Sequence, residues 1–236
     1  MHVRPPRCGR QLTGSLTGLN SREFLSSLPE CILSDRTVQS AATSYSPLAA
    51  VMWPTRPGET VGALRAVVLI ALGSALMALS AKVNLPLPYV PMTLQTLVVL
   101  VIGAAFGWRL GSATMIAYLA EGAMGLPVFA GPVGGIAPLL GPTAGYLYGF
   151  VAAAFITGWL AERGWDRNVL LLFAAMAVAH VVIFIVGFGW LAYGIGLGAD
   201  KAWLVGVAPF IAASVIKNAL GAALMPAVRR IVDRRG

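Results

Sequence analysis

Charged side chains are scarce in this sequence. Asp, Glu, Lys and Arg make up 11% of the 236 residues, whereas a soluble domain carries about 25%. Long stretches contain none of the four: 66–81, 83–108, 122–161, 168–199 and 202–216. Because a membrane-spanning helix needs about 20 apolar residues, this shortage excludes an ordinary soluble domain. It predicts an all-α, polytopic membrane protein.

Several kinds of reactive motif are also missing. No GxxxxGK[ST] phosphate loop occurs, which excludes a P-loop ATPase. The apolar stretches contain no pair of carboxylates for metal-dependent lipid chemistry and no His/Cys cluster that would hold zinc. The two cysteines, Cys8 and Cys31, both precede these stretches. We therefore expect no metal, no cofactor and no enzymatic activity, which leaves a binding or transport role.

Apolar residues are abundant, and they occur in long runs typical of membrane-spanning helices. The sequence is 58% hydrophobic with a mean hydropathy of +0.79. The last span begins at Pro209, which suits a first helical turn, and its 20 residues give about 30 Å, one bilayer core. The pattern predicts six transmembrane helices at about 64–83, 92–107, 110–128, 140–161, 169–193 and 209–228.

The net charge is +8, and the basic residues lie between the predicted spans and at the C-terminal tail. This distribution is typical of residues that set the orientation of a membrane protein, and not of a nucleic-acid-binding surface. With six spans, both termini lie on one side. On that side, the connections and the parts of the termini close to the spans have nine arginines: Arg56, Arg65, Arg109, Arg163, Arg167, Arg229, Arg230, Arg234 and Arg235. The opposite connections carry only Lys82 and Lys201. The positive-inside rule therefore predicts cytoplasmic termini and outward loops at 84–91, 129–139 and 194–208, the last with an interfacial segment around Trp203.

Two regions outside the spans have an unusual composition. Residues 1–58 are rich in serine and arginine and lack the apolar core of a secretory signal. They are either a disordered extension or upstream sequence before a true start at Met52, and the membrane domain is 61–230. The outward loops at 84–91 and 129–139 are apolar and rich in proline and glycine. They are either lid segments packed on protein or short rigid turns.

Three ionisable residues fall inside the predicted spans: Glu121, His180 and Lys217. A charge at a helix centre costs about 2.5–3.5 kcal/mol, so such residues are functional candidates. Lys217 lies about 12 Å from the outer end of its helix, with Ser214 on the same face. Its partner is either Glu121 or an anion or carbonyl of a ligand. We expect His180 to be a core residue bonded to a backbone carbonyl.

Four segments together resemble the BioY family, the substrate-binding S components of energy-coupling-factor biotin transporters. They read LPLPYVPMTLQTLVVLVIGAAFG (85–107), YLAEGAMGLPVFAG (118–131), GPTAGYLYGF (141–150) and PFIAASVIKNAL (209–220). They occur in the family's order and spacing, and the resemblance covers about 61–230.

The resemblance implies a bacterial cytoplasmic-membrane protein that captures biotin in a cavity near its outer face. It implies that Lys217 contacts the ligand. Many members carry an acidic residue where this chain has Ser214, so Glu121 or the ligand's own charge is expected to compensate the lysine. Tyr146 is expected to form a cavity wall, and Gln95 or Thr143 to donate a hydrogen bond.

The family also docks a transmembrane T component through small residues of the first helix, where Ala71 and Ala75 match the spacing. Energised uptake would need that partner and two ATPase subunits. The alternatives are uptake of another vitamin-like amphipathic acid, an intramembrane lipid-modifying enzyme, or a structural subunit in which Lys217 pairs only with Glu121.

Overall fold

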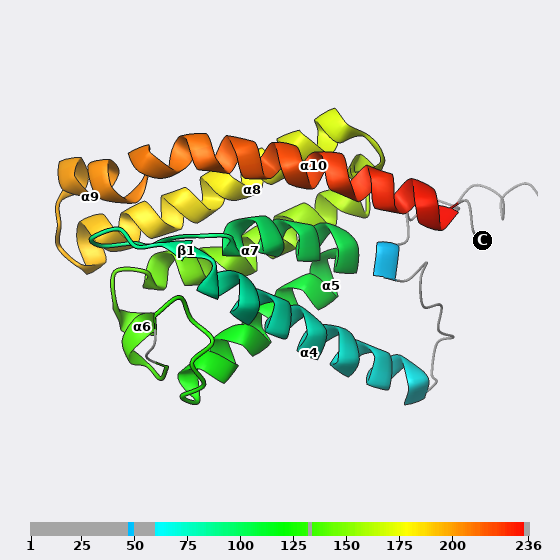
Figure 1. Cartoon of the computed structure of the whole chain (residues 1–236), viewed down its shortest axis with the longest axis horizontal. Coiled ribbons are helices and arrows are strands. Elements are labelled where there is room, and N and C mark those ends of the chain that lie inside the picture. The colour runs from blue at the N-terminus through cyan, green and yellow to red at the C-terminus, as the bar shows by residue number, and fades with distance from the viewer. Residues whose placement is uncertain (1–46, 50–59, 132–133, 234–236) are drawn as a thin grey trace, which may run out of the picture. The chain divides into compact units, whose positions relative to one another are not determined.

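The computed structural model describes residues 47–49, 60–131 and 134–233, and helices account for most of them (Figure 1). The predicted extension 1–58, apart from 47–49, and the alternative start at Met52 lie outside the described residues. The elements follow in the order α4 (Thr60–Lys82), β1 (Asn84–Leu85), β2 (Met92–Thr93), α5 (Gln95–Ala123), α6 (Ala137–Leu140), α7 (Ala144–Ala161), η1 (Trp165–Arg167), α8 (Val169–Gly189), η2 (Trp190–Gly194), α9 (Ala199–Gly206), η3 (Ala208–Phe210) and α10 (Ile211–Asp233).

Five helical stretches of the described chain are long and apolar enough to cross a membrane, where the sequence predicts six. They are Gly62–Lys82, Gln95–Ala123, Ala144–Ala161, Val169–Gly194 and Ala199–Ile231. The difference arises because the second and third predicted spans both fall within α5.

α5 is not one straight rod but two arms that fold back on each other at Gly107. That residue has φ 79° and ψ 174°, outside the helical region. A Cβ built on Gly111 would lie 3.1 Å from the Cα of Gly103, and the Gln95 amide donates to the Tyr118 hydroxyl at 2.7 Å. In a straight helix, residues 95 and 118 would be about 34 Å apart. The chain therefore reverses where the sequence pattern places a break.

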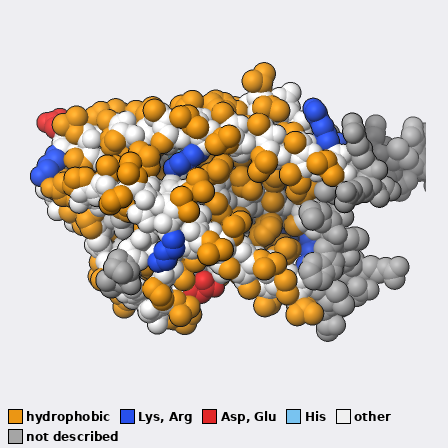
Figure 2. Space-filling model, viewed as in Figure 1, with side chains coloured by type: hydrophobic (Ala, Val, Ile, Leu, Met, Phe, Trp, Pro, Cys, Tyr) orange, Lys and Arg blue, Asp and Glu red, His pale blue; other side chains and the backbone are white. Residues whose placement is uncertain are grey.

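α7 forms the centre of the bundle, because it packs extensively against both α5 and α8. Small residues allow the close approach: a Cβ on Gly149 would lie 3.0 Å from the Cα of Ile183 in α8. Outward-facing side chains are also apolar, among them Leu170 of α8 at 78% exposure and Leu79 of α4 at 68%. Figure 2 shows hydrophobic side chains over most of the visible face. An apolar exterior of this extent is what a lipid-facing surface requires.

The β1–β2 hairpin, α6 and α9 all lie at one end of the described bundle (Figure 1). These elements contain or adjoin the three predicted outward loops. The first loop is a two-stranded hairpin in which Asn84 pairs with Thr93. The third contains a short helix, α9, that includes Trp203. The apolar loops are thus partly structured segments that pack near the helix ends.

A buried ion pair joins α10 to the connection before α8. The Arg229 guanidinium donates to the Asp166 carboxylate of η1, and both side chains are almost inaccessible. Asn168 then caps α8, accepting hydrogen bonds from the backbone N–H groups of Leu170 and Leu171. Arg229 therefore serves packing as well as the charge asymmetry counted in the sequence.

Candidate functional site

A cavity of about 310 Å³ lies beside the β1–β2 hairpin, enclosed by segments from across the sequence. This volume is at the lower end of the range for small-molecule sites, about 300–1,000 Å³. Its lining is mostly apolar, with aromatic rings from four different segments. The lining residues are Val90, Pro91, Thr93, Gln95, Thr96, Phe129, Ala130, Gly131, Pro138, Thr143, Tyr146, Leu147, Phe150, Ile183, Phe184, Phe210, Ser214 and Lys217.

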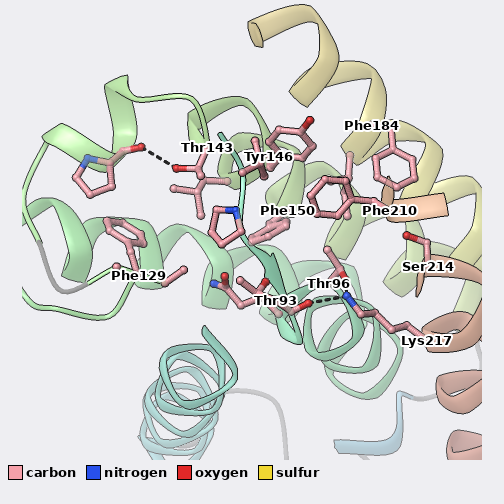
Figure 3. A pocket seen from close by; sticks show the side chains of 18 residues that line it. Thr93, Thr96, Phe129, Thr143, Tyr146, Phe150, Phe184, Phe210, Ser214 and Lys217 are labelled. Carbon is pink, nitrogen blue, oxygen red and sulfur yellow. Dashed lines mark hydrogen bonds between the residues drawn. The ribbon is translucent and has the colours of Figure 1, made fainter. Parts of the chain in front are cut away.

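Lys217 is the cationic residue of this lining. Its Nζ donates to the Thr93 carbonyl at 2.5 Å and to the Thr96 hydroxyl at 3.1 Å (Figure 3). An ammonium has three donors, and these two contacts leave one for a ligand. None of the described residues that line the cavity is acidic. The ammonium is therefore oriented by neutral oxygens and carries a charge that the cavity wall does not balance.

Ser214 lies one helical turn before Lys217 and lines the same cavity. Its side chain is buried, with 7% exposure. Both residues lie on one side of the view in Figure 3, while Phe129 and Thr143 lie toward the other. One end of the cavity is thus polar and positively charged.

Gln95 and Tyr146 also line the cavity. The Tyr146 hydroxyl and one of the two N–H donors of the Gln95 amide already have protein partners. The Gln95 amide donates to the Tyr118 hydroxyl, which donates in turn to the Val128 carbonyl at 3.0 Å. The Tyr146 hydroxyl donates to the Gly206 carbonyl at 2.7 Å. Tyr146 therefore presents its ring to the cavity, in the position of a wall.

Thr143 lines the cavity at the start of α7. Its hydroxyl donates to the Pro138 carbonyl of α6 over a long 3.4 Å, as Figure 3 shows. A bond of this length lies beyond the usual range, so the Thr143 hydroxyl is held only weakly and can turn to a ligand.

Glu121 is not among the lining residues, and the ion pair with Lys217 offered as one alternative is wrong. The Glu121 carboxylate accepts a hydrogen bond from the Ser74 hydroxyl at 2.8 Å, which joins α5 to α4. Lys217 instead contacts β2 and the start of α5. The sequence places Glu121 and Lys217 in the outer halves of their predicted spans. Whether the two side chains face each other depends on how the helices pack, which the sequence position does not give.

His180 is a core residue, as expected, with 2% exposure. Its partner is not a backbone carbonyl, however, but the side chain of Asn218, whose Oδ1 lies 2.6 Å from His180 Nδ1. This contact joins α8 to α10 directly beside Lys217.

Thr96 and the aromatic residues of the cavity wall are not among the residues predicted from the sequence. Thr96 lies three residues after Thr93, close behind the first predicted outward loop, so this pair of threonines could have been identified from the sequence. The rings of Phe129, Phe150, Phe184 and Phe210 come from four segments. Aromatic residues recur in every predicted span after the first, so nothing in the local sequence marks these four.

These features define a class of protein: a helical membrane protein with a cavity suited to a small amphipathic solute. Its polar end offers an ammonium group and hydroxyls, and its remaining wall is apolar. Comparison with known sequences identifies the family. The sequence model of the BioY family matches residues 48–234, and the chain belongs to this family.

The relatives agree with this assignment. A probable biotin transporter BioY of Pyrococcus horikoshii is 40% identical over 151 residues, which cover 64% of this chain and 88% of the relative. The biotin transporter BioY of Rhizobium etli is 39% identical over 173 residues, covering 70% and 89%.

A solved structure shares the fold. It is the crystal structure of an S-component for biotin from an ECF-type ABC transporter. The TM-score is 0.66 at 22% sequence identity, and the match covers 73% of this chain and 94% of the other.

Proposed function

We propose that this chain is the biotin-binding S component of an energy-coupling-factor transporter and takes up biotin across the bacterial cytoplasmic membrane. The relatives named as biotin transporters support the ligand. The observation that carries the proposal is the Lys217 ammonium, which lies in a mostly apolar cavity with no acidic residue in its described lining. A small guest with a carboxylate at one end and an apolar body complements such a cavity.

Binding by the purified chain tests the proposal. The chain is expected to retain labelled biotin, and Lys217→Met is expected to release it. Losing one partner of a buried, hydrogen-bonded charge pair costs about 2–5 kcal/mol, which is a loss of affinity of about 30-fold or more. Lys201→Met is the control, because it removes a positive charge from an exposed side chain outside the cavity. Equal retention by Lys217→Met and wild type would remove the lysine from the site.

A neutral analogue shows which part of the ligand meets the lysine. If Lys217 contacts the carboxylate, wild type binds biotin more tightly than biotinamide, and Lys217→Met binds the two equally. A preference for biotin that survives in the variant would show that a group other than Lys217 meets the carboxylate. Competition by other small amphipathic acids tests the alternative that another vitamin-like acid is the true ligand.

We also propose that the chain crosses the membrane six times: α4, the two arms of α5, α7, α8 and α10. The reversal at Gly107 supports this count, and the arginine distribution supports cytoplasmic termini. Cysteines introduced singly at Gly131 and Arg109 are expected to react with an impermeant thiol reagent from opposite faces of the membrane.

Uptake driven by ATP requires partners, which we propose are a transmembrane T component and two ATPase subunits. Ala71 and Ala75 are exposed on α4, a helix with little of its surface buried in the bundle. The small-residue spacing on this uncovered helix supports docking of the T component there.

A further inference from the structure

Lys82, at the end of α4, is held by backbone oxygens. Its Nζ donates to the carbonyls of Pro127 at 2.7 Å, Phe129 at 2.9 Å and Gly131 at 3.3 Å. These three contacts match the three donors of an ammonium. In an extended chain, the groups of successive residues point to opposite sides, so the carbonyls of alternate residues, such as 127, 129 and 131, can point toward the same side chain. Lys82 thus binds the backbone of segment 127–131 from one side.

This segment belongs to the cavity. Phe129, Ala130 and Gly131 line it, and Phe129 is only 3% exposed. From the protein side, the Phe129 ring packs edge-on against Tyr118, with ring centroids 5.5 Å apart, and the Tyr118 hydroxyl donates to the Val128 carbonyl.

The backbone of the segment has little support of its own. Among the described residues, the carbonyls of Pro127, Phe129 and Gly131 accept from no backbone N–H group. Asn84 adds one long contact, from its amide to the Ala130 carbonyl at 3.4 Å. Lys82 therefore supplies most of the polar contacts that fix the outer edge of this cavity wall.

An ion pair does not explain the lysine. The salt bridge found within the described part of the chain joins Arg229 to Asp166, far along the sequence from Lys82. Lys201 shows the contrast, since its Nζ lies over the ring of Tyr89, 5.2 Å from the ring centre, and Tyr89 belongs to the loop between β1 and β2. The contacts of Lys82 are directed at one segment.

We infer that Lys82 is a positioning residue that holds segment 127–131 closed against the cavity and thereby slows release of the bound ligand. The inference rests on the proposed function for the identity of the ligand. Lys82 contacts the segment and does not line the cavity. Its loss is therefore expected to change how often the segment moves away from the cavity.

Dissociation kinetics test this inference. Purified chain loaded with labelled biotin is chased with excess unlabelled biotin. Lys82→Met keeps the length of the side chain but removes its hydrogen-bond donors. This variant is expected to release the label about tenfold faster, which corresponds to a barrier to release lowered by about 1.4 kcal/mol. Lys82→Arg, which retains N–H donors, is expected to restore slow release. Lys201→Met controls for weaker electrostatic attraction of an anion, which changes the association rate.

Hydrogen exchange of the ligand-free chain gives a readout that does not depend on biotin. In Lys82→Met, amides of 128–131 are expected to exchange faster, while those in the centre of α7 are unchanged. Unchanged exchange there and unchanged release would overturn the inference, as would equal acceleration by Lys201→Met. If wild type retains no biotin, the proposed function fails, and the exchange measurement alone decides the role of Lys82.

Discussion

At the scale of single residues, the site depends on which polar groups already have partners. Lys217 has two neutral contacts and a charge still to be balanced. Tyr146, by contrast, uses its hydroxyl on the Gly206 carbonyl, and only its ring remains for the cavity. The two residues line one cavity but are expected to contribute differently: Lys217 to ligand affinity, and Tyr146 to the position of the wall.

Tyr146→Phe separates these roles. Removing the hydroxyl leaves a buried carbonyl without its donor, which costs about 1–3 kcal/mol of folding stability, while the ring that lines the cavity stays. We expect a lower unfolding temperature and a loss of biotin affinity much smaller than that of Lys217→Met. Tyr148→Phe is the matched control, since its hydroxyl bonds the Leu139 carbonyl at an exposed position. A loss of affinity in Tyr146→Phe as large as that of Lys217→Met would make the hydroxyl a ligand donor.

At the scale of elements, the reversal of α5 brings the site together. Because the chain turns at Gly107, the first arm begins beside the end of the second, and Gln95 reaches Tyr118. β2 and the first arm thereby present Thr93 and Thr96 to Lys217. The second arm leads into the segment that Lys82 contacts. The turn itself is packed against α7, where the Glu162 carboxylate accepts from the Trp108 backbone N–H at 3.2 Å.

Gly107→Ala is expected to destabilise this turn. Its φ of 79° lies in the region that residues with a Cβ rarely adopt, a strain of about 1–3 kcal/mol. The added methyl group would also collide with the Glu162 carboxylate. We expect a clear fall in the unfolding temperature of the purified chain. Gly189→Ala is the control, because that glycine is helical and has open space around it. Equal unfolding temperatures for the two variants would show that the turn tolerates a side chain.

At the scale of the whole molecule, the helices differ in how much of their surface the bundle covers. In the most apolar part of α7, 61% of the residues are buried, whereas in that of α4 only 22% are. A helix so lightly covered has an outer face available to lipid or to a partner subunit. The small residues Ala71 and Ala75 fall on exposed positions of α4, which favours close approach of another helix there.

Ala71→Leu tests this docking face. The added bulk points away from the cavity, so we expect unchanged biotin binding by the isolated chain. Co-purification with a co-expressed T component and its ATPase subunits is expected to fall sharply, because close helix packing depends on small residues. Ala223→Leu makes the same change at an exposed position of α10 and should leave the complex intact. Complex formation that survives Ala71→Leu would place the docking face elsewhere.

The membrane class, the helical segments and the candidate lysine followed from the sequence alone. Hydropathy and charge are properties of short windows, so Lys217 is conspicuous in an apolar stretch without any knowledge of the fold. The break at Gly107 and the Tyr146 position in the cavity were also predictable from local pattern and family resemblance.

Tertiary structure alone decided the partners. Lys217 meets Thr93 and Thr96, which lie 124 and 121 residues earlier in the chain, whereas Glu121 turns to Ser74 and His180 to Asn218. The hydrogen bonds from Lys82 to three backbone carbonyls likewise could not be predicted from the local sequence, since the carbonyl of any residue can accept a hydrogen bond. Which polar groups meet depends on how the helices rotate and pack, and no single stretch of sequence contains that information.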